Sequence, residues 1–302
     1  MQLKPTLQPF LDKGTDPEGA DIVLFAAPLD KTTSHRSGTR FGPQAIRVES
    51  TYMDTYSART GLDWDDLSLA DAGDVDCPDV ETALRGVEEA AASVRGLPVM
   101  LGGEHTVTLG ALRALKPDLV VVFDAHLDLR EELFGERLCH ATYLRLGYEE
   151  LGFKALVVGA RALSGEEVEY AASNPDLAYI TPQQIRRGEK DPVEEAAALA
   201  SDAKKVYVSL DMDALDPCYA PAVGNPHPEG LSPTQVLDVA EAVVDRKLVG
   251  LDVNEVYPHY DTGQTAVTAA YILMEALYLY TGAVRRPGSR ACRPRMTRSP
   301  SS

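Results

Sequence analysis

The stretch Leu119-Val-Val-Val-Phe-Asp124-Ala-His126-Leu-Asp128 decides the fold and locates the candidate site. Its first five residues are apolar, without polar alternation, as in a strand buried on both faces of a parallel sheet. Side chains alternate along an extended chain, so if the extended conformation persists, Asp124, His126 and Asp128 point the same way just beyond the strand. Two carboxylates and an imidazole suit a divalent metal such as Mn²⁺. The alternative is an Asp-rich turn that holds a hydrogen-bonded histidine.

Two further stretches end in similar groups. Val206-Tyr-Val-Ser-Leu-Asp211-Met-Asp213 ends in two carboxylates, and Pro98-Val-Met-Leu-Gly-Gly-Glu-His105 ends in a histidine. Alone, Asp211-x-Asp213 could be a Ca²⁺ loop, but it lacks the glycine and closing glutamate of an EF-hand. One metal ordinarily needs fewer than six protein ligands, so two metals that share carboxylates are favoured. The six candidate ligands are His105, Asp124, His126, Asp128, Asp211 and Asp213.

These motifs resemble the signatures of the ureohydrolases, the arginase and agmatinase family. Three other stretches share the resemblance. Residues 37–47 resemble the family's N-terminal glycine loop, residues 220–230 its proline-rich loop in the agmatinase form, and residues 252–261 its last strand and loop. The motifs occur in the family's order over roughly residues 20–283. Departures are mild, among them Glu104 for aspartate, Asn225 for threonine and Cys139 for a small hydroxyl residue, and none is a candidate ligand.

The resemblance implies two Mn²⁺ ions per subunit and a role for each site residue. The implied ligands are His105 and Asp128 for one ion, His126 and Asp213 for the other, and Asp124 and Asp211 as bridges. The implied catalytic residues are Glu255, which would pair with a guanidinium group, and His140, which would move protons. Without the resemblance, His140 could be a surface histidine at a helix start and Glu255 an ordinary surface carboxylate.

The implied reaction is hydrolysis of a guanidino group to urea and an amine, with agmatine giving putrescine as the expected case. Arg130 stands where arginases hold the substrate carboxylate, but the neighbouring Glu131 and Glu132 and the Pro-Glu-Gly loop favour the small cation agmatine. Aminopropylagmatine, arginine, guanidinobutyrate and formiminoglutamate stay open as substrates, as does a non-catalytic metal-binding member. The deacetylase branch would need one zinc and a His-His pair, which the sequence lacks.

The rest of the chain alternates strands and helices. Strands are also expected at residues 21–27, 99–101, 155–159, 177–180 and 248–253. Helices are expected from Gly42, after a cap at Asp79, from Thr106 to Leu115, at residues 191–203, after a capping box at Ser232, and at residues 265–281 with Gly282 as the stop. The pattern predicts an α/β fold: a three-layer, doubly wound, mainly parallel sheet of eight strands that binds ligands at the strands' carboxyl ends.

Composition and charge fit a single enzyme domain. The chain has 302 residues, 44% of them hydrophobic, enough for a large core. We expect one ureohydrolase catalytic domain over residues 1–284 and a disordered tail over residues 285–302, which hold six arginines and no acid. The net charge of −17 argues against nucleic-acid binding; it either attracts a cationic substrate or serves solubility.

Location and assembly are also predicted. The first residues lack a signal-peptide pattern, and no apolar run approaches the length of a membrane span, so we expect no membrane-spanning helix. Four scattered cysteines without a Cys-x-x-Cys pair predict free thiols in a reducing compartment, hence a cytoplasmic protein. The resemblance implies a homotrimer or homohexamer.

Overall fold

The computed structural model describes residues 3–285. Within these residues, eight parallel strands form one sheet in the order β2-β1-β3-β8-β7-β4-β5-β6. This arrangement confirms the predicted eight-stranded α/β fold. The strands are β1 (Ile22–Ala27), β2 (Leu69–Asp74), β3 (Leu97–Gly102), β4 (Leu119–Phe123), β5 (Lys154–Val158), β6 (Leu177–Ile180), β7 (Val206–Asp211) and β8 (Leu248–Asn254).

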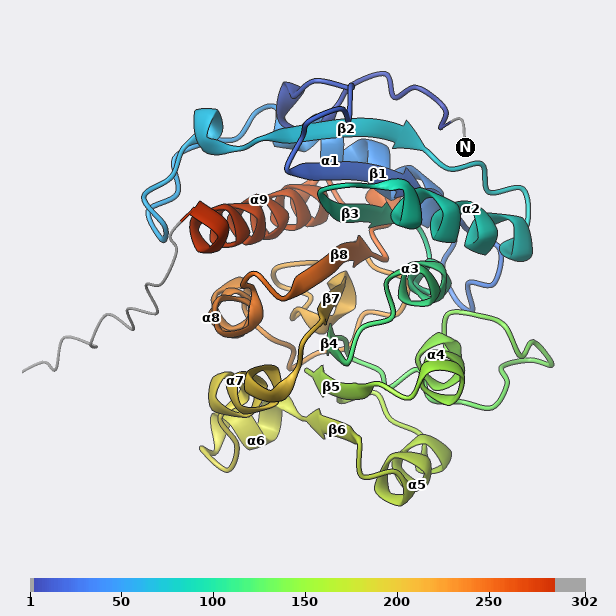
Figure 1. Cartoon of the computed structure of the whole chain (residues 1–302). Coiled ribbons are helices and arrows are strands. Elements are labelled where there is room, and N and C mark those ends of the chain that lie inside the picture. Colours follow the sequence, from blue (N-terminus) through green and yellow to red (C-terminus); the bar gives the residue numbers. More distant parts are fainter. Residues whose placement is uncertain (1–2, 286–302) are drawn as a thin grey trace, which may run out of the picture.

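Helices cover both faces of the sheet and make it the middle of three layers (Figure 1). One face carries α2 (Val80–Ser93), α3 (Thr108–Leu115), α4 (Tyr143–Leu151) and α5 (Gly165–Ser173). The other carries α1 (Gly42–Ser50), α6 (Pro182–Arg186), α7 (Pro192–Asp202), α8 (Pro233–Val243) and α9 (Gln264–Arg285). The central strands are buried on both faces, because their side chains contribute alternately to the two hydrophobic cores.

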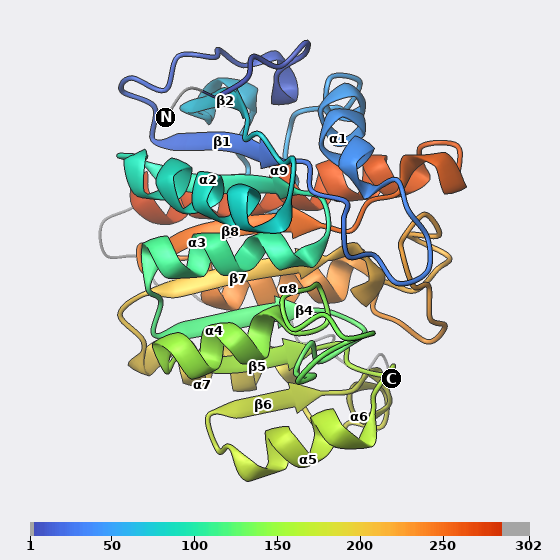
Figure 2. The same cartoon turned by 90° about the vertical axis from the view of Figure 1, so that its right-hand side faces the viewer.

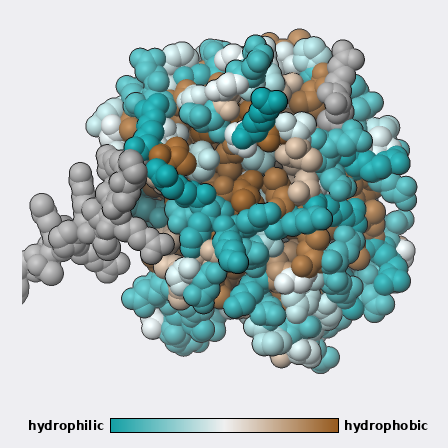
Figure 3. All heavy atoms as spheres, in the orientation of Figure 1, coloured by the Kyte–Doolittle hydropathy of each residue, from teal (hydrophilic) through white to brown (hydrophobic). Residues whose placement is uncertain are grey.

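The strands run with their carboxyl ends toward one side of the molecule, on the right of Figure 2. The long connections after β1, β4 and β7 gather there. Figure 3 looks at the opposite side, where hydrophilic side chains surround a smaller group of hydrophobic ones. The candidate site therefore belongs to the loop-rich side at the carboxyl ends, as in other open parallel sheets.

Several helix starts follow the predicted caps. As predicted, the Asp79 side chain accepts a hydrogen bond from Thr82 N at the start of α2. Asp191, expected only as the first residue of its helix, caps α7. Ser232 forms a full capping box with Gln235 at the start of α8. Such caps satisfy backbone N–H groups that lack a partner within the helix, which is why these starts can be recognised locally.

Two predicted helix boundaries were wrong. Thr106 does not cap α3, because its hydroxyl donates to Glu104 Oε1 and a 3-10 turn at His105–Val107 precedes the helix. Gly282 does not stop α9, which continues to Arg285. The Arg246 guanidinium donates to the carbonyls of Ala283 and Val284, and these bonds satisfy part of the helix end.

The strand β2 was not predicted, because its acidic residues are compensated by a buried ion pair that the sequence does not show. Its Asp71 is fully buried and accepts from Arg47 of α1 at 2.7 Å and 2.8 Å, while Asp74 accepts from Arg47 at 2.6 Å. These acids make the strand resemble a polar loop in the sequence. The two-pronged guanidinium compensates the buried carboxylate, so the segment can lie in the sheet.

Within the described residues, the helix α9 is long and apolar enough to cross a membrane. The sequence analysis had not expected such a helix. Of its apolar stretch, 56% is buried inside the protein, against α1, α8 and β8. Its buried apolar side chains belong to the hydrophobic core, whereas Val267 and Tyr271 are exposed. Arg285, assigned to the tail in the sequence analysis, ends this helix and pairs with Asp66 at 2.6 Å. Residues 286–302 lie outside the described part of the chain.

Candidate metal centre

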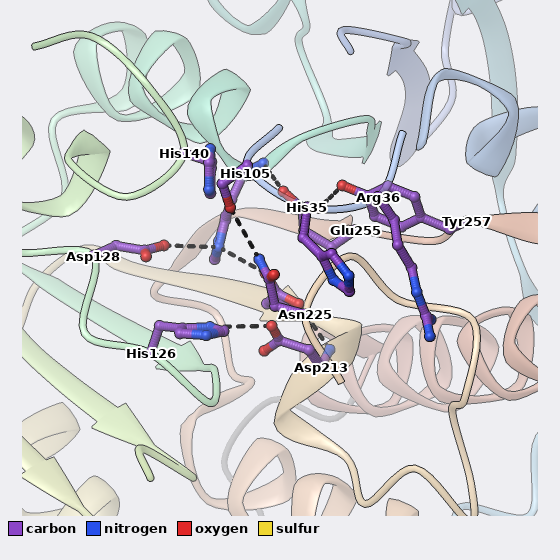
Figure 4. A pocket seen from close by; sticks show the side chains of 12 residues that line it. His35, Arg36, His105, His126, Asp128, His140, Asp213, Asn225, Glu255 and Tyr257 are labelled. Carbon is purple, nitrogen blue, oxygen red and sulfur yellow. Dashed lines mark hydrogen bonds and ion pairs between the residues drawn. The ribbon is translucent and has the colours of Figure 1, made fainter. Parts of the chain in front are cut away.

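The predicted ligands come together at the carboxyl ends of neighbouring strands. His105 follows β3, Asp124 follows β4, and Asp211 ends β7. In Figure 4, His105, His126, Asp128 and Asp213 point toward one another in one pocket, beside Glu255 and His140. Parallel strands bring these ends side by side, which is how segments far apart in the sequence share a site.

The first group of ligands surrounds Nδ1 of His105. This nitrogen lies 3.1 Å from Asp124 Oδ2, 3.3 Å from Asp211 Oδ2 and 3.4 Å from Asp128 Oδ2. All four side chains are buried. His105, Asp124 and Asp211 are close enough to hold one metal ion.

The second group surrounds Nδ1 of His126, which lies 3.1 Å from Asp213 Oδ2 and 3.3 Å from Asp124 Oδ1. His126, Asp124 and Asp213 could also hold an ion. Asp124 thus faces both histidines, one with each carboxylate oxygen. The sequence analysis predicted this position for a bridging ligand. The Asp211 side chain faces His105 and also accepts a hydrogen bond from Asp213 N at 2.7 Å.

A buried chain of hydrogen bonds favours the tautomer of His105 that carries its proton on Nε2. Ser209 Oγ donates to Asp252 Oδ1 at 2.5 Å, so its oxygen is free to accept from His105 Nε2, 2.8 Å away. The Tyr143 hydroxyl lies 2.9 Å from the same nitrogen. With the proton on Nε2, the lone pair of Nδ1 faces three carboxylates. Metal-binding histidines are commonly held this way.

The charges in this cluster do not balance without a cation. Burial, reinforced by Asp124, raises the pKa of Asp128 to about 8. Burial, together with Asp213 and Asp124, also raises the pKa of Asp211 well above its usual range. Burial opposes a charged His126, but Asp213 and Asp124 outweigh it and raise that pKa. A divalent cation would take the place of protons that these groups otherwise retain.

The residues fit a metal by a second observation as well. His105 Nδ1 is buried and has no hydrogen-bond partner in the described structure, although it faces three acids. The inner pocket between the histidines and acids holds about 10 Å³, the order of volume that one water or ion occupies. A ligand set of carboxylates and imidazoles without thiolates suits a divalent ion such as Mn²⁺, Fe²⁺ or Zn²⁺.

Glu255 lies next to the metal cluster at the end of β8. Its Oε1 accepts from His105 N at 2.7 Å and its Oε2 from the Tyr257 hydroxyl at 2.7 Å. Burial raises the pKa of Glu255 to about 8. Glu255 has a φ of 64° and Asp128 a φ of 53°, a left-handed conformation that non-glycine residues seldom adopt. Strain of this kind is typical of residues held in place for function.

A wider cavity of about 270 Å³ opens outward from the cluster. His126, Asp128 and His140 form its inner part, and Arg130 and Phe134 are in its outer wall. His35 and Arg36 close the inner pocket from the loop after β1; His35 Nδ1 donates to Gly224 O, and Arg36 donates to the carbonyls of Pro221 and Val223. The cavity is large enough for the chain of a small linear substrate.

The structure brings all eight predicted site residues together, and it adds some that the sequence analysis missed. Ser209 is the only hydroxyl in its apolar strand apart from the tyrosine, and it lies two residues before Asp211, on the same side of the strand. That position was a readable signal. Tyr143 and Asp252 gave none, because their contacts with His105 and Ser209 join segments far apart in the sequence. Asn225 was noted only as a departure from the family pattern, and it lines the pocket.

Comparisons with known proteins agree with this geometry. Residues 20–278 match the arginase family. The guanidinobutyrase of Pseudomonas aeruginosa is 34% identical, with 92% of each chain covered, and the agmatinase of Pyrococcus horikoshii is 36% identical, with 85% of this chain and 91% of that one covered. The crystal structure of an agmatine ureohydrolase from Thermoplasma volcanium matches with a TM-score of 0.85 and 33% identity, over 93% of this chain and 96% of that one. The chain belongs to the arginase family of hydrolases that act on guanidino groups.

Proposed function

We propose that the protein is a binuclear manganese enzyme that hydrolyses a linear guanidino compound to urea and an amine. The two ligand groups that share Asp124 are the observation that carries this proposal. As the resemblance implies, His105 and Asp128 would hold one ion, His126 and Asp213 the other, and Asp124 and Asp211 would be shared. Asp124 faces both histidines, and Asp211 faces His105. When bound, the ions would lower the pKa of water and supply a nucleophile near neutral pH.

The chain's own residues would place the substrate and move its protons. Glu255 would accept two N–H bonds from the planar guanidinium and hold its carbon beside the cluster. His140 is in the wall of both the inner pocket and the wider cavity, where it could pass a proton to the departing nitrogen. Water adds to the guanidino carbon, the C–N bond to the chain breaks, and the products are urea and a protonated amine.

We propose agmatine as the substrate, as predicted from the sequence. Its support is the similarity to agmatinases and the acidic net charge, which favours the approach of a cation. A second candidate class is the guanidino acids. Arg130 is in the cavity wall, 3.7 Å from Glu167, and its partly exposed guanidinium would attract a substrate carboxylate but repel the terminal ammonium of agmatine.

Urea release separates these possibilities. Agmatine, 4-guanidinobutyrate and arginine are compared with the Mn²⁺-loaded protein and after chelation. Metal-dependent urea from agmatine supports the first candidate. Urea mainly from 4-guanidinobutyrate, with a KM that rises in Arg130→Met but not in the exposed control Arg137→Met, supports the second. No urea from any of the three compounds, with Mn²⁺ shown to be bound, contradicts the proposed reaction.

The role of Glu255 has its own test. Glu255→Gln keeps the side chain's shape but removes the charge that pairs with the guanidinium. We expect kcat/KM to fall by about 10²-fold or more, because the transition state loses a charge-assisted, bidentate pair of hydrogen bonds. Glu136→Gln, at an exposed glutamate outside the lining of the pocket and the cavity, is the matched control and should leave kcat/KM unchanged.

Location and assembly are part of the proposal. We propose a cytoplasmic homotrimer or homohexamer. Cys77, Cys139 and Cys218 are free thiols in the structure, which supports a reducing compartment. Light scattering on the purified full chain gives the number of subunits, and a monomer would contradict the proposed assembly.

A further inference from the structure

Glu104 is a fully buried carboxylate beside the metal cluster but outside the ligand set. Its Oε2 accepts from the backbone of Lys31 at 2.6 Å and of Thr32 at 2.8 Å. Its Oε1 accepts from the hydroxyls of Thr32 at 2.7 Å and Thr106 at 2.9 Å. Four donors converge on one carboxylate, which compensates the burial of its charge. The loop after β1 is thereby attached to the end of β3.

The Thr32 hydroxyl consequently has a fixed direction. A hydroxyl has one proton, and Thr32 gives it to Glu104, so its oxygen can only accept from other groups. Two nitrogens of His140 approach that oxygen. The backbone N–H donates to it at 3.3 Å, and the ring Nδ1 lies 3.5 Å away. Because the Thr32 oxygen can only accept, its contact with His140 Nδ1 is favourable when Nδ1 carries a proton.

We propose that Glu104 and Thr32 are positioning residues that hold the neutral His140 ring with its proton on Nδ1, which leaves the lone pair of Nε2 available as a base toward the substrate cavity. The arrangement is a carboxylate–hydroxyl–imidazole chain, Glu104–Thr32–His140. The consequence for the reaction depends on the proposed role of His140 as the group that moves protons. The ring orientation itself does not depend on that role.

Single substitutions of similar size separate this chain from ordinary packing. Thr32→Val removes the hydroxyl but keeps the shape. We expect kcat to fall about 10-fold to 100-fold, part of the roughly 10²–10⁴-fold that a positioned acid–base group contributes, with KM little changed. Thr32→Ser restores the hydroxyl and should recover most of kcat. Thr106→Val is the matched control, since it removes the other hydroxyl that donates to Glu104. Thr106 Oγ1 lies 3.5 Å from Thr32 Oγ1, and within the described residues no hydrogen bond joins it to His140.

Three kinetic results would each overturn the proposal. One is a Thr32→Val variant with the wild-type kcat. Another is a Thr106→Val variant whose kcat falls as far as that of Thr32→Val, because the effect would then belong to the packing around Glu104. The third is a Thr32→Ser variant as slow as Thr32→Val, which would contradict a role for the hydroxyl.

A spectroscopic measurement tests the ring independently of any substrate. The ¹⁵N-imidazole spectrum of the full chain, loaded with diamagnetic Zn²⁺, distinguishes the two neutral tautomers, and the His140 signals are those that disappear in His140→Gln. We expect the Nδ1–H form in the wild type and a shift toward Nε2–H in Thr32→Val. An Nε2–H form in the wild type overturns the inference. If no guanidino compound is hydrolysed, the proposed function fails while this test still decides the orientation of the ring.

Discussion

Replacing Ser209 by alanine should weaken metal binding without touching a ligand. Ser209 Oγ donates to Asp252 at 2.5 Å and lies 2.8 Å from Nε2 of His105. The hydroxyl therefore keeps the His105 proton on Nε2 and the lone pair of Nδ1 toward the acids. In Ser209→Ala that proton loses its main acceptor, and the ring is free to turn or to carry the proton on Nδ1.

The expected loss of metal affinity depends on the contacts that His105 keeps in Ser209→Ala. Removing the group that orients a metal ligand typically lowers metal affinity about 10-fold to 100-fold, or about 1.4–2.8 kcal/mol at 1.4 kcal/mol per tenfold. Because the Tyr143 hydroxyl stays 2.9 Å from Nε2, we expect the lower half of this range. Asp252 also loses a donor, which should lower the free energy of unfolding by about 1.5–3 kcal/mol.

Thr108→Val is the matched control for this experiment. Thr108 donates to the other oxygen of Asp252 at 2.8 Å, so its substitution should lower stability by a similar amount without a contact to His105. Mn²⁺ binding is measured from the EPR signal of unbound Mn²⁺ during titration, and stability from urea denaturation of the metal-free proteins. A Ser209→Ala variant that binds Mn²⁺ as tightly as the wild type would refute the role of this hydroxyl. A Thr108→Val variant that weakens binding equally would refute it too.

The same kinds of contact support three other predictions. The pKa of Asp128 is raised to about 8, so the metal-free folded protein holds a proton that the unfolded chain loses near pH 4. The contribution of this proton to stability therefore falls as pH rises from about 4 to 8. Because Mn²⁺ competes with the proton, the increase in Tm that Mn²⁺ causes in thermal denaturation should be larger at pH 8 than at pH 6. Arg47→Met leaves Asp71 buried and unpaired and should lower the free energy of unfolding by about 3–5 kcal/mol in urea denaturation, whereas a decrease under about 1 kcal/mol would contradict the buried ion pair. Gly103→Ala would place a Cβ against the carbonyl oxygen of Leu29 and displace the turn that carries His105. Mn²⁺ titration should therefore show weaker binding. An unchanged affinity would mean that the turn adjusts without moving the histidine.

Much of the fold was predictable because its strongest signals are local. Strands such as β4 and β7 are buried on both faces and form apolar runs that end in acids. The caps at Asp79 and Ser232 show in the sequence because the bonds they make span three residues. The ligands were found from their spacing after apolar strands, but the expected strand alternation was wrong. β4 ends at Phe123, a bend follows, Asp128 is left-handed and Asp213 lies in a 3-10 turn, so turns direct these side chains into the site.

The predictions that failed depended on contacts between residues far apart in the sequence or on an unexpected partner. β2 was missed because Asp71 looks like a surface acid until Arg47 of α1, 24 residues earlier, is placed beside it. Thr106 was assigned to a helix cap because its local position suits one, but Glu104 takes its hydroxyl instead. In both cases a polar side chain satisfies a buried group whose partner is determined by the fold, not by neighbouring residues.

The two histidines most relevant to function show the same limit. His105 and His140 are each predictable from motifs, but their protonation is set by Ser209 and Thr32, which contact them across 104 and 108 residues of sequence. In each case the hydroxyl first donates to a buried carboxylate, Asp252 or Glu104, and so can only accept from the ring. A motif identifies the imidazole; the fold determines which nitrogen is free. For His105 that nitrogen faces the acids that would hold a metal, and for His140 we infer that it faces the substrate. The same kind of contact thus prepares one ring as a ligand and the other as a base.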